Sequence, residues 1–389
     1  MQNIDKKERK NVGIYIHVPF CLSKCHYCDF CSVLRADGSK RERYVARLCS
    51  EIASFAQKIG ESGKIPVADT VYFGGGTPTL LTAEQFERIL AAVDSSFGIA
   101  EGAEITAETN PKTADGEKLS DLRRLGVNRL SIGMQSVHDG ELKALGRIHS
   151  FADFLETYGA ARKVGFDNLS VDLMYGIPRQ TKESFAESVK TLCRLAPEHI
   201  SSYCLTVEED TNFGRRRDSL ILPDEDEVGD MYAEMTAILS ENGYEKYEIS
   251  NFARKGRESR HNAKYWRLDG YLGFGSAAHS FYSGVRFAHS RDVDAYIEGR
   301  DTIIEVERIG ERDAMDEFAM LGMRLSRGVS CAEFEERFGR EFFSVFPNFK
   351  KYAPEFVCFD GGVCRFTEKG MLVSNTILAD ALALGEDTL

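Results

Sequence analysis

The chain has 389 residues, of which 43 % are apolar and 28 % charged, proportions ordinary for a globular protein with room for more than one domain. Its formal net charge of −12 argues against a nucleic-acid partner, because phosphate binding needs a positive field. The apolar runs are too short for an integral membrane segment, and the charged N-terminus is unlike a signal peptide.

The cysteine content indicates the cellular compartment. Ten cysteines in a chain of this length are too sparse for a disulfide scaffold, which favours a reducing, cytoplasmic location. Cys193, Cys204 and Cys331 fall in apolar-patterned segments, and we expect them to be reduced, buried thiols.

Residues 12–222 alternate between short β-branched runs and amphipathic stretches, behind a short tail of residues 1–11. The predicted strands are Val12–Val18, Thr70–Phe73, Glu104–Glu108, Arg129–Ile132, Asn168–Met174 and Ile200–Thr206. The predicted helices are Tyr44–Lys58, Ala83–Val93, Asp121–Leu125, Phe151–Val164 and Glu183–Leu195. Six β-α steps imply a parallel sheet, two short of a closed barrel. The predicted fold class is therefore α/β, with a partial (β/α)6 TIM-like barrel.

The first predicted strand leads into three cysteines, Cys21, Cys25 and Cys28, at C-x3-C-x2-C spacing. Three thiolates leave one iron of a [4Fe-4S] cluster open, and an open metal position admits a substrate. S-adenosylmethionine (SAM) is the natural occupant, and electron transfer would cleave it to a carbon radical. Two alternatives are a zinc site, which prefers separated cysteine pairs, and a closed electron-carrier cluster with Cys31 as fourth ligand.

Polar residues recur where each later strand is predicted to end, and the carboxyl ends of parallel strands share one rim. These residues are Gly74–Pro78, Glu108, Asn110, Gln135, Asp172, Thr206 and Glu208. The glycines allow close backbone approach to the methionine part of SAM. Glu108 and Asp172 suit its ribose or ammonium, while Gln135 and Arg147 suit its carboxylate. Tight turns, helix caps and ion pairs are the structural alternatives.

Residues 223–300 are predicted to extend the barrel. A helix over Asp224–Asn242 and a strand over Tyr244–Ser250 precede a basic segment, residues 254–266, which holds four basic residues up to Arg260, then His261 and the only tryptophan. This segment could receive two propionates, with His261 as a haem-iron ligand. A solvated basic loop is the alternative.

Residues 301–389 are predicted to form a separate winged-helix-like unit. Two helices, Asp313–Leu325 and Cys331–Phe338, precede a hairpin over Phe356–Phe366 and a final helix over Asn375–Leu384. The segment is acidic, which favours an interaction surface or a lid over DNA binding.

Taken in order, these features resemble the radical SAM superfamily and, more narrowly, its coproporphyrinogen III oxidase-like branch. The resemblance runs from about Gly13 to Ala383. The matching segments are Tyr15–Cys21, Gly74–Thr79, Leu145–His149, Asp172–Pro178 and the winged unit.

Within this branch, His261-Asn-x-x-Tyr-Trp266 is similar to the HNxxYW signature of haem chaperones of the HemW type. The oxygen-independent oxidases have a longer N-terminal extension and a fourth cysteine two positions after the third. Here about eleven residues precede the first strand, and Cys31 lies three positions after Cys28. Chaperones commonly have Asn at that position, so the role of Cys31 stays open.

The resemblance implies roles for individual residues. Cys21, Cys25 and Cys28 would ligate the cluster, and Tyr15, Gly75 and Glu108 would contact the cluster-bound SAM. Positions that contact a second SAM in the oxidases are matched by Tyr27, Gly76, Thr77, Gln135, Arg147 and Asp172. His261 would contact haem.

Three functions follow from this resemblance. The favoured one is a haem chaperone, with haem, an acceptor protein and an electron donor as partners. The second is a coproporphyrinogen III oxidase that converts two propionates to vinyls, and the third is a radical SAM methyltransferase. Whether the chain is an enzyme stays open, although the scaffold implies an ability to cleave SAM.

Overall fold

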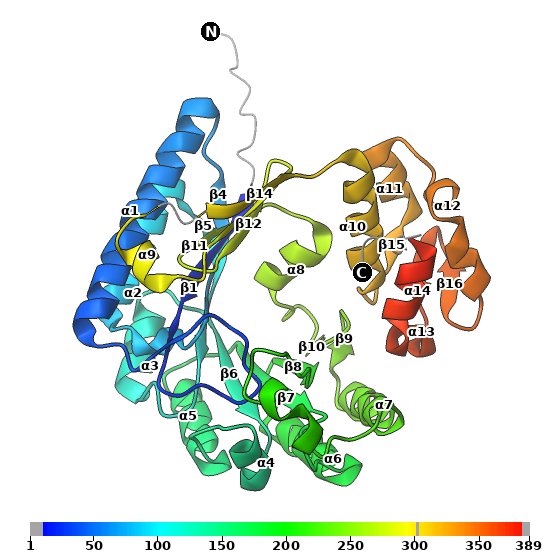
Figure 1. Cartoon of the computed structure of the whole chain (residues 1–389), viewed down its shortest axis with the longest axis horizontal. Helices are drawn as coiled ribbons and strands as arrows, with labels where there is room; N and C mark the ends of the chain where they lie inside the picture. Colours follow the sequence, from blue (N-terminus) through cyan, green and yellow to red (C-terminus); the bar gives the residue numbers. More distant parts are fainter. Residues whose placement is uncertain (1–10, 301–302, 383–389) are drawn as a thin grey trace.

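A computed structural model of the chain describes residues 11–300 and 303–382. The predicted N-terminal tail, except Asn11, lies outside these ranges, as do the last two residues of the predicted final helix. Figure 1 shows a curved sheet covered by helices on its outer side, with a smaller unit beside it.

The main sheet has twelve strands in the order β14-β13-β12-β11-β1-β4-β5-β6-β7-β8-β10-β9. Its centre consists of β1 (Asn11–Val18), β4 (Val67–Gly75), β5 (Ile99–Thr109), β6 (Arg129–Gln135), β7 (Leu169–Tyr175) and β8 (His199–Cys204). These six strands are parallel neighbours, as predicted. The edge strands β14 and β9 are not paired with each other, so the barrel is open, which confirms the predicted partial barrel.

Helices between the parallel strands cover the outer face of the sheet (Figure 1). They are α1 (Gly38–Ser62), α2 (Ala83–Phe97), α3 (Gly116–Arg124), α4 (Asp139–Ala144), α5 (Phe151–Lys163) and α6 (Lys182–Leu195), and α7 (Glu225–Glu241) packs on α6. Apolar residues at helical spacing face the sheet, for example Phe86, Ile89 and Val93 of α2. Side chains at most of their N-caps, such as Thr82 of α2, accept from a free backbone N–H group, whereas α4 has no such cap.

The inner face of the sheet is polar. Alternate residues of each strand point inward, and many of these positions hold polar side chains. On β6 the inward-facing residues are Arg129, Ser131, Gly133 and Gln135, all of which line one cavity. Asp172 of β7 pairs in register with Gly133 and therefore lies on the same level. The alternation thus separates an apolar outer core from a polar interior that can hold a ligand.

The edges of the sheet differ in part from the predictions. In place of one strand over Tyr244–Ser250, two short strands, β9 (Glu245–Lys246) and β10 (Asn251–Ala253), pair antiparallel beside β8. At the other edge β11 (Tyr271–Phe274) is a seventh parallel strand, followed by β12 (His279–Tyr282), β13 (Val285–His289) and, after α9 (Val293–Ile297), β14 (Ile303–Arg308). The sheet therefore continues past the boundary predicted at residue 301.

The basic segment after β10 contains a helix that the sequence pattern did not predict. This helix, α8 (Arg260–Arg267), begins at the N-cap Ser259 and packs between β4 and α10 (Glu311–Met323). It lies on the open side of the curved sheet, facing the smaller unit (Figure 1). His261 is therefore part of a helix that fills the opening of the barrel.

The smaller C-terminal unit has a three-stranded sheet, in the order β15 (Val329–Ser330), β17 (Val363–Phe366) and β16 (Val357–Asp360). Its remaining elements are α11 (Cys331–Phe338), α12 (Phe342–Val345), α13 (Glu368–Leu372) and α14 (Ser374–Ala381). The hairpin turns at Gly361 and Gly362, which both have positive φ. A separate aromatic cluster that includes Phe334, Phe342 and Phe349 forms its core.

The ten cysteines all lie in the described ranges, and none forms a disulfide. The prediction that Cys193, Cys204 and Cys331 are buried was wrong: Cys204 is exposed and the other two are half-buried. Cys204 ends β8, where the strand leaves the sheet. Across residues 11–300 and 303–382, no helix combines the length and apolar character that a membrane crossing requires.

Candidate functional site

The three predicted cluster ligands lie in the loop that follows β1. Two short strands, β2 (Phe20–Cys21) and β3 (Val33–Leu34), pair in parallel and close the base of this loop. In its middle, the backbone N–H of His26 donates to the Leu145 carbonyl at 2.9 Å, and its carbonyl accepts from Phe213 at 2.9 Å. The rest of the barrel therefore holds the cysteine loop in place on both sides.

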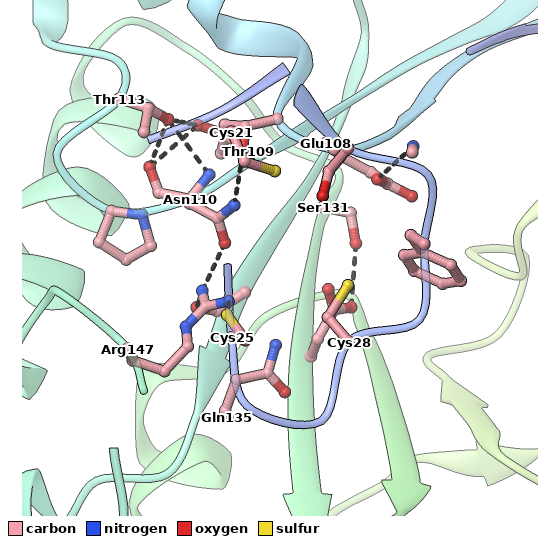
Figure 2. Close-up of a pocket in the computed structure, with 18 of the residues that line it drawn as sticks. Cys21, Cys25, Cys28, Glu108, Thr109, Asn110, Thr113, Ser131, Gln135 and Arg147 are labelled. Carbon is pink, nitrogen blue, oxygen red and sulfur yellow. Dashed lines mark hydrogen bonds between the residues drawn. The ribbon is translucent and has the colours of Figure 1, made fainter. Parts of the chain in front are cut away.

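A hydrogen-bonded chain connects the cysteines to the neighbouring strand ends (Figure 2). The Cys21 thiol lies 3.7 Å from the Thr77 hydroxyl, which accepts from the Asn110 amide at 2.9 Å. The Arg147 guanidinium donates to the Asn110 side-chain oxygen and approaches Cys25 Sγ at 3.5 Å. Three loops far apart in sequence thus fix two of the cysteine side chains.

A cavity of about 380 Å³ opens beside these cysteines. It is lined by all of the predicted site residues except Tyr15 and His261: Cys21, Cys25, Tyr27, Cys28, Gly75, Gly76, Thr77, Glu108, Gln135, Arg147 and Asp172. This volume lies within the range of small-molecule sites. The expectation that strand-end residues converge holds for this set, but not for Thr206 and Glu208, because β8 already ends at Cys204 and neither residue lines the cavity.

The glycine segment is shaped by close contacts. Gly75 has φ of +106°, a conformation that favours glycine. A Cβ on Gly76 would lie 2.7 Å from the Phe20 carbonyl oxygen and 2.9 Å from that of Val18. Only glycine therefore lets the end of β4 pack this closely against the start of the cysteine loop.

Glu108 is the most strongly connected acid of the cavity. It accepts from the Tyr72 hydroxyl at 2.9 Å and from the Gly75 backbone N–H at 3.2 Å. Burial, reinforced by the nearby carboxylate of Asp172, raises the pKa of Glu108 to about 7. Burial also raises the pKa of Asp172, which accepts from Ser131 at 3.0 Å. Both acids are thus poised to receive positively charged or hydrogen-bond-donating groups.

Tyr15 and His261 lie below the cavity. The Tyr15 ring and the His261 ring both stack on Tyr72, with centroids 6.2 and 5.1 Å from that of Tyr72. The Tyr15 and His261 centroids are 6.4 Å apart, so the three rings form one cluster. His261 is 1 % exposed, and its Nδ1 and Nε2 atoms each form a 2.8 Å hydrogen bond, to Thr70 and Tyr265. Burial lowers the pKa of His261 to about 3, so the imidazole is neutral. Iron coordination by this residue requires that one of these hydrogen bonds break.

The basic residues before His261 lie away from the cavity, contrary to the expected propionate site. Arg254 packs over the Tyr244 ring, Arg257 pairs with Asp167, and Arg260 donates to the Gly102 carbonyl. Asp167 precedes β7, and Gly102 lies in the first half of β5. These contacts lie at the amino ends of the strands, opposite the cysteine loop, because the segment continues from β10 along that edge.

Several cavity residues were not among the predicted site residues. They are Tyr72, Arg129, Ser131, Tyr203 and Asn262, among others, whereas the predicted rim residue Asn110 does line the cavity. Four of them could have been found from the sequence: Tyr72 of β4, Arg129 and Ser131 of β6, and Tyr203 of β8. Alternate side chains of a strand point to the same face, and these four belong to the inward-facing sets. Asn262 depends on α8, so only the tertiary structure places it. Cys31 does not line the cavity; its thiol donates to the Arg291 carbonyl at 3.2 Å.

The donor set fits a multi-iron cluster better than a single ion. Among the described residues, no three His, Cys, Asp or Glu side chains converge closely enough to bind one metal ion. A cluster with one thiolate per iron needs more widely spaced sulfurs than zinc does. Burial raises the pKa of Cys28 to about 11, so this thiol is protonated at neutral pH and must lose its proton to bind metal.

Comparisons with known proteins agree with this geometry. The radical SAM superfamily profile matches residues 15–192, and the HemN C-terminal domain profile matches residues 309–373. The chain is 34 % identical to "Heme chaperone HemW" of Bacillus subtilis, over 93 % of this chain and 97 % of that protein. It is 35 % identical to the Escherichia coli protein of the same name, over 83 % and 85 %.

A solved structure of coproporphyrinogen III oxidase (HemN) from Escherichia coli has the same fold. The TM-score is 0.82 at 23 % identity, and the match covers 95 % of this chain and 89 % of that one. The barrel and the C-terminal unit are both included in this coverage, which confirms the predicted architecture.

Proposed function

The chain belongs to the HemW family within the radical SAM superfamily, and on this premise we propose that it is a haem chaperone that binds haem and passes it to an acceptor protein. The observation that carries the proposal is the HNxxYW segment on α8, in a chain that matches HemW relatives over most of its length. The scaffold is a radical SAM barrel, with a [4Fe-4S] cluster and SAM as its cofactors.

The residues of the cavity have distinct tasks in this proposal. Cys21, Cys25 and Cys28 ligate the cluster, which when bound supplies the electron for reductive cleavage of SAM. Glu108 accepts a hydrogen bond from the SAM ammonium, while Arg147 binds its carboxylate. Tyr15 supports Glu108 indirectly, through the Tyr72 ring on which it stacks. The cavity walls exclude water from these contacts.

We propose that His261 binds haem iron through Nε2 once its hydrogen bond to Tyr265 has broken. Its other nitrogen, Nδ1, keeps the bond to Thr70, and such a second bond commonly orients a metal-bound histidine. The neutral imidazole is the form that binds iron. Tyr265 thus occupies the coordination position in the haem-free state.

Two variants of α8 test this assignment in anaerobic haem titrations followed by Soret absorbance. His261→Ala should abolish saturable binding, whereas Tyr265→Phe frees Nε2 and should strengthen binding about fivefold. His279→Ala is the control, because that histidine is exposed on β12. If both α8 variants lower thermal stability and neither alters haem affinity, His261 has a purely structural role.

The same samples, given coproporphyrinogen, SAM and a low-potential reductant, separate the two branches of the family. A chaperone leaves coproporphyrinogen unchanged and transfers its haem to the haem-free form of a respiratory haem enzyme faster than free haem enters it. Formation of two vinyl groups per porphyrin would instead identify an oxidase and reject the chaperone proposal.

The proposal includes an acidic protein as electron donor. Arg215, Arg216 and Arg217 are exposed on η2 (Gly214–Ser219), and in the described part of the chain none pairs with a carboxylate. The adjacent Phe213 packs on His26 in the cysteine loop, so these three arginines lie beside the proposed cluster ligands. Arg215→Glu with Arg217→Glu should slow reduction by a flavodoxin but not by dithionite.

A further inference from the structure

Arg129 is a buried cation that forms no ion pair with any residue that the structure describes. It begins β6, is 1 % exposed and lines the cavity described above. Its buried Nε atom has no hydrogen-bond partner, and the guanidinium forms no ion pair within the described residues. A guanidinium stays protonated at every pH that proteins encounter, so this side chain carries a full positive charge into the barrel.

Such an arrangement is unfavourable unless an anion joins it. Burying an unpaired charge costs several kcal/mol, and native proteins almost always provide a partner. The two acids of the cavity feel its charge, which offsets part of the rise in pKa that burial causes in each, but neither forms an ion pair with it. Asp172 bonds to Ser131 instead, and Glu108 bonds to Tyr72 and Gly75. Neither lies within ion-pair distance of Arg129. The missing partner is therefore a group that enters the cavity from outside.

The position of Arg129 separates it from the SAM contacts at the rim. Gln135, at the other end of β6, lies six residues further along, which corresponds to about 20 Å of extended strand. The cysteine loop and Arg147 are at that upper end. The methionine carboxylate of a SAM held at the cluster therefore binds near Arg147, not near Arg129.

We propose that Arg129 is an anion subsite that binds the carboxylate of a second molecule sharing the cavity with SAM. A planar guanidinium matches a carboxylate with two parallel hydrogen bonds. Asn262 lines the same cavity, and its side-chain amide offers further donors. Glu108 and Asp172 disfavour a doubly charged phosphate, so the single charge of a carboxylate fits best. This subsite does not depend on haem binding.

Propionate and its uncharged isostere propionamide are suitable probes. They are added, at equal ionic strength, to cluster-loaded protein saturated with SAM, and the midpoint of thermal unfolding is measured. Propionate should raise this midpoint by about 2 °C or more, and propionamide should not. Arg129→Met should remove the difference, while Arg124→Met, on the exposed surface of α3, should retain it.

The absence of a difference between propionate and propionamide in the wild-type protein would overturn the proposal, as would a difference that persists in Arg129→Met. Arg129→Lys covers the case in which the methionine variant does not fold, since it keeps the charge but loses the paired geometry and should weaken the propionate effect. No haem is present, so this result is independent of the proposed chaperone function.

Discussion

The open cavity and helix α8 both contact strand β5, and each does so through a glutamate of that strand. The two glutamates have different roles. Glu108, near the carboxyl end of β5, accepts from Tyr72 and Gly75 beside the open cavity. Glu104, four residues earlier, accepts the backbone N–H groups of Arg260 and His261 at 3.1 and 3.0 Å. The first glutamate faces a ligand site, and the second fixes the start of α8.

The residue types in a motif do not determine whether its side chains are open to a ligand. The cysteine loop and the HNxxYW segment are both short motifs that contain cysteine or histidine, residue types that can bind metal. The loop lies at the carboxyl ends of parallel strands, where backbone groups are free to meet a ligand. Helix α8 instead fills the open side of the barrel, and His261 has both ring nitrogens hydrogen-bonded. Variants of the rim should therefore alter cofactor binding, and variants around α8 should alter stability.

The largest effect is expected at the cluster ligands. Replacing Cys21, Cys25 or Cys28 by Ala should abolish the near-visible absorbance of the reconstituted cluster, because an iron loses its thiolate. The apoprotein should unfold at an unchanged temperature, since these side chains are only half-buried. An intact cluster in any of the three variants would show that another residue ligates the iron.

Glu104→Leu tests the other side of the comparison. It removes both acceptors at the N-terminus of α8 and should lower the free energy of unfolding by about 2–4 kcal/mol. Chemical denaturation measures this loss. SAM affinity, measured by calorimetry, should not change, because Glu104 does not line the cavity. A large loss of SAM affinity would mean that the two regions are coupled.

Gly76→Ala should act on the cavity alone. The new methyl group meets the Phe20 and Val18 carbonyls, so the segment must shift, at a cost of about 1–3 kcal/mol in SAM binding. Gly140→Ala in α4 is the matched control, because a Cβ there meets no atom within 4 Å. If both variants bind SAM normally, the glycine segment is a turn without a role in binding.

The pH dependence of Glu108 gives a smaller effect. Its pKa of about 7 means that the carboxylate form, and with it SAM affinity, should increase about tenfold between pH 5.5 and 7. The folded protein holds this proton above the ordinary pKa of 4.5, so Glu108 should lower stability as pH rises from about 4.5 to 7. In Glu108→Gln, SAM affinity and the free energy of unfolding should both lose this dependence on pH. If either dependence persists, it is caused by another titrating group.

The smallest effect is expected for Cys31. Its thiol bonds to the Arg291 carbonyl and does not line the cavity, so Cys31→Ala should leave the cluster absorbance intact. Iron content and the absorbance spectrum of the reconstituted variant measure this. Loss of the cluster would mean that Cys31 is a fourth ligand, and that the open iron position does not exist.

Much of the rim was predictable because its residues follow the ends of strands whose pattern is strong. Cys21, Gly76, Glu108 and Asp172 were placed together by the rule for parallel sheets, and they line one cavity. The edges of the sheet were less predictable. Strands β9 and β10 are only two and three residues long, so a pattern of period two has too few positions to detect.

The parallel barrel, the cysteine loop and the hairpin at Gly361 could be predicted from the sequence, because each depends on local periodicity, residue spacing or turn chemistry. The tertiary structure was needed to show that α8 fills the barrel opening, that both ring nitrogens of His261 are hydrogen-bonded, and that Arg129 forms no ion pair with any described residue. These properties depend on contacts between residues far apart in the sequence, such as Thr70 and His261, which are 191 positions apart. A local sequence pattern does not show which side chains, distant in the chain, contact each other inside the barrel.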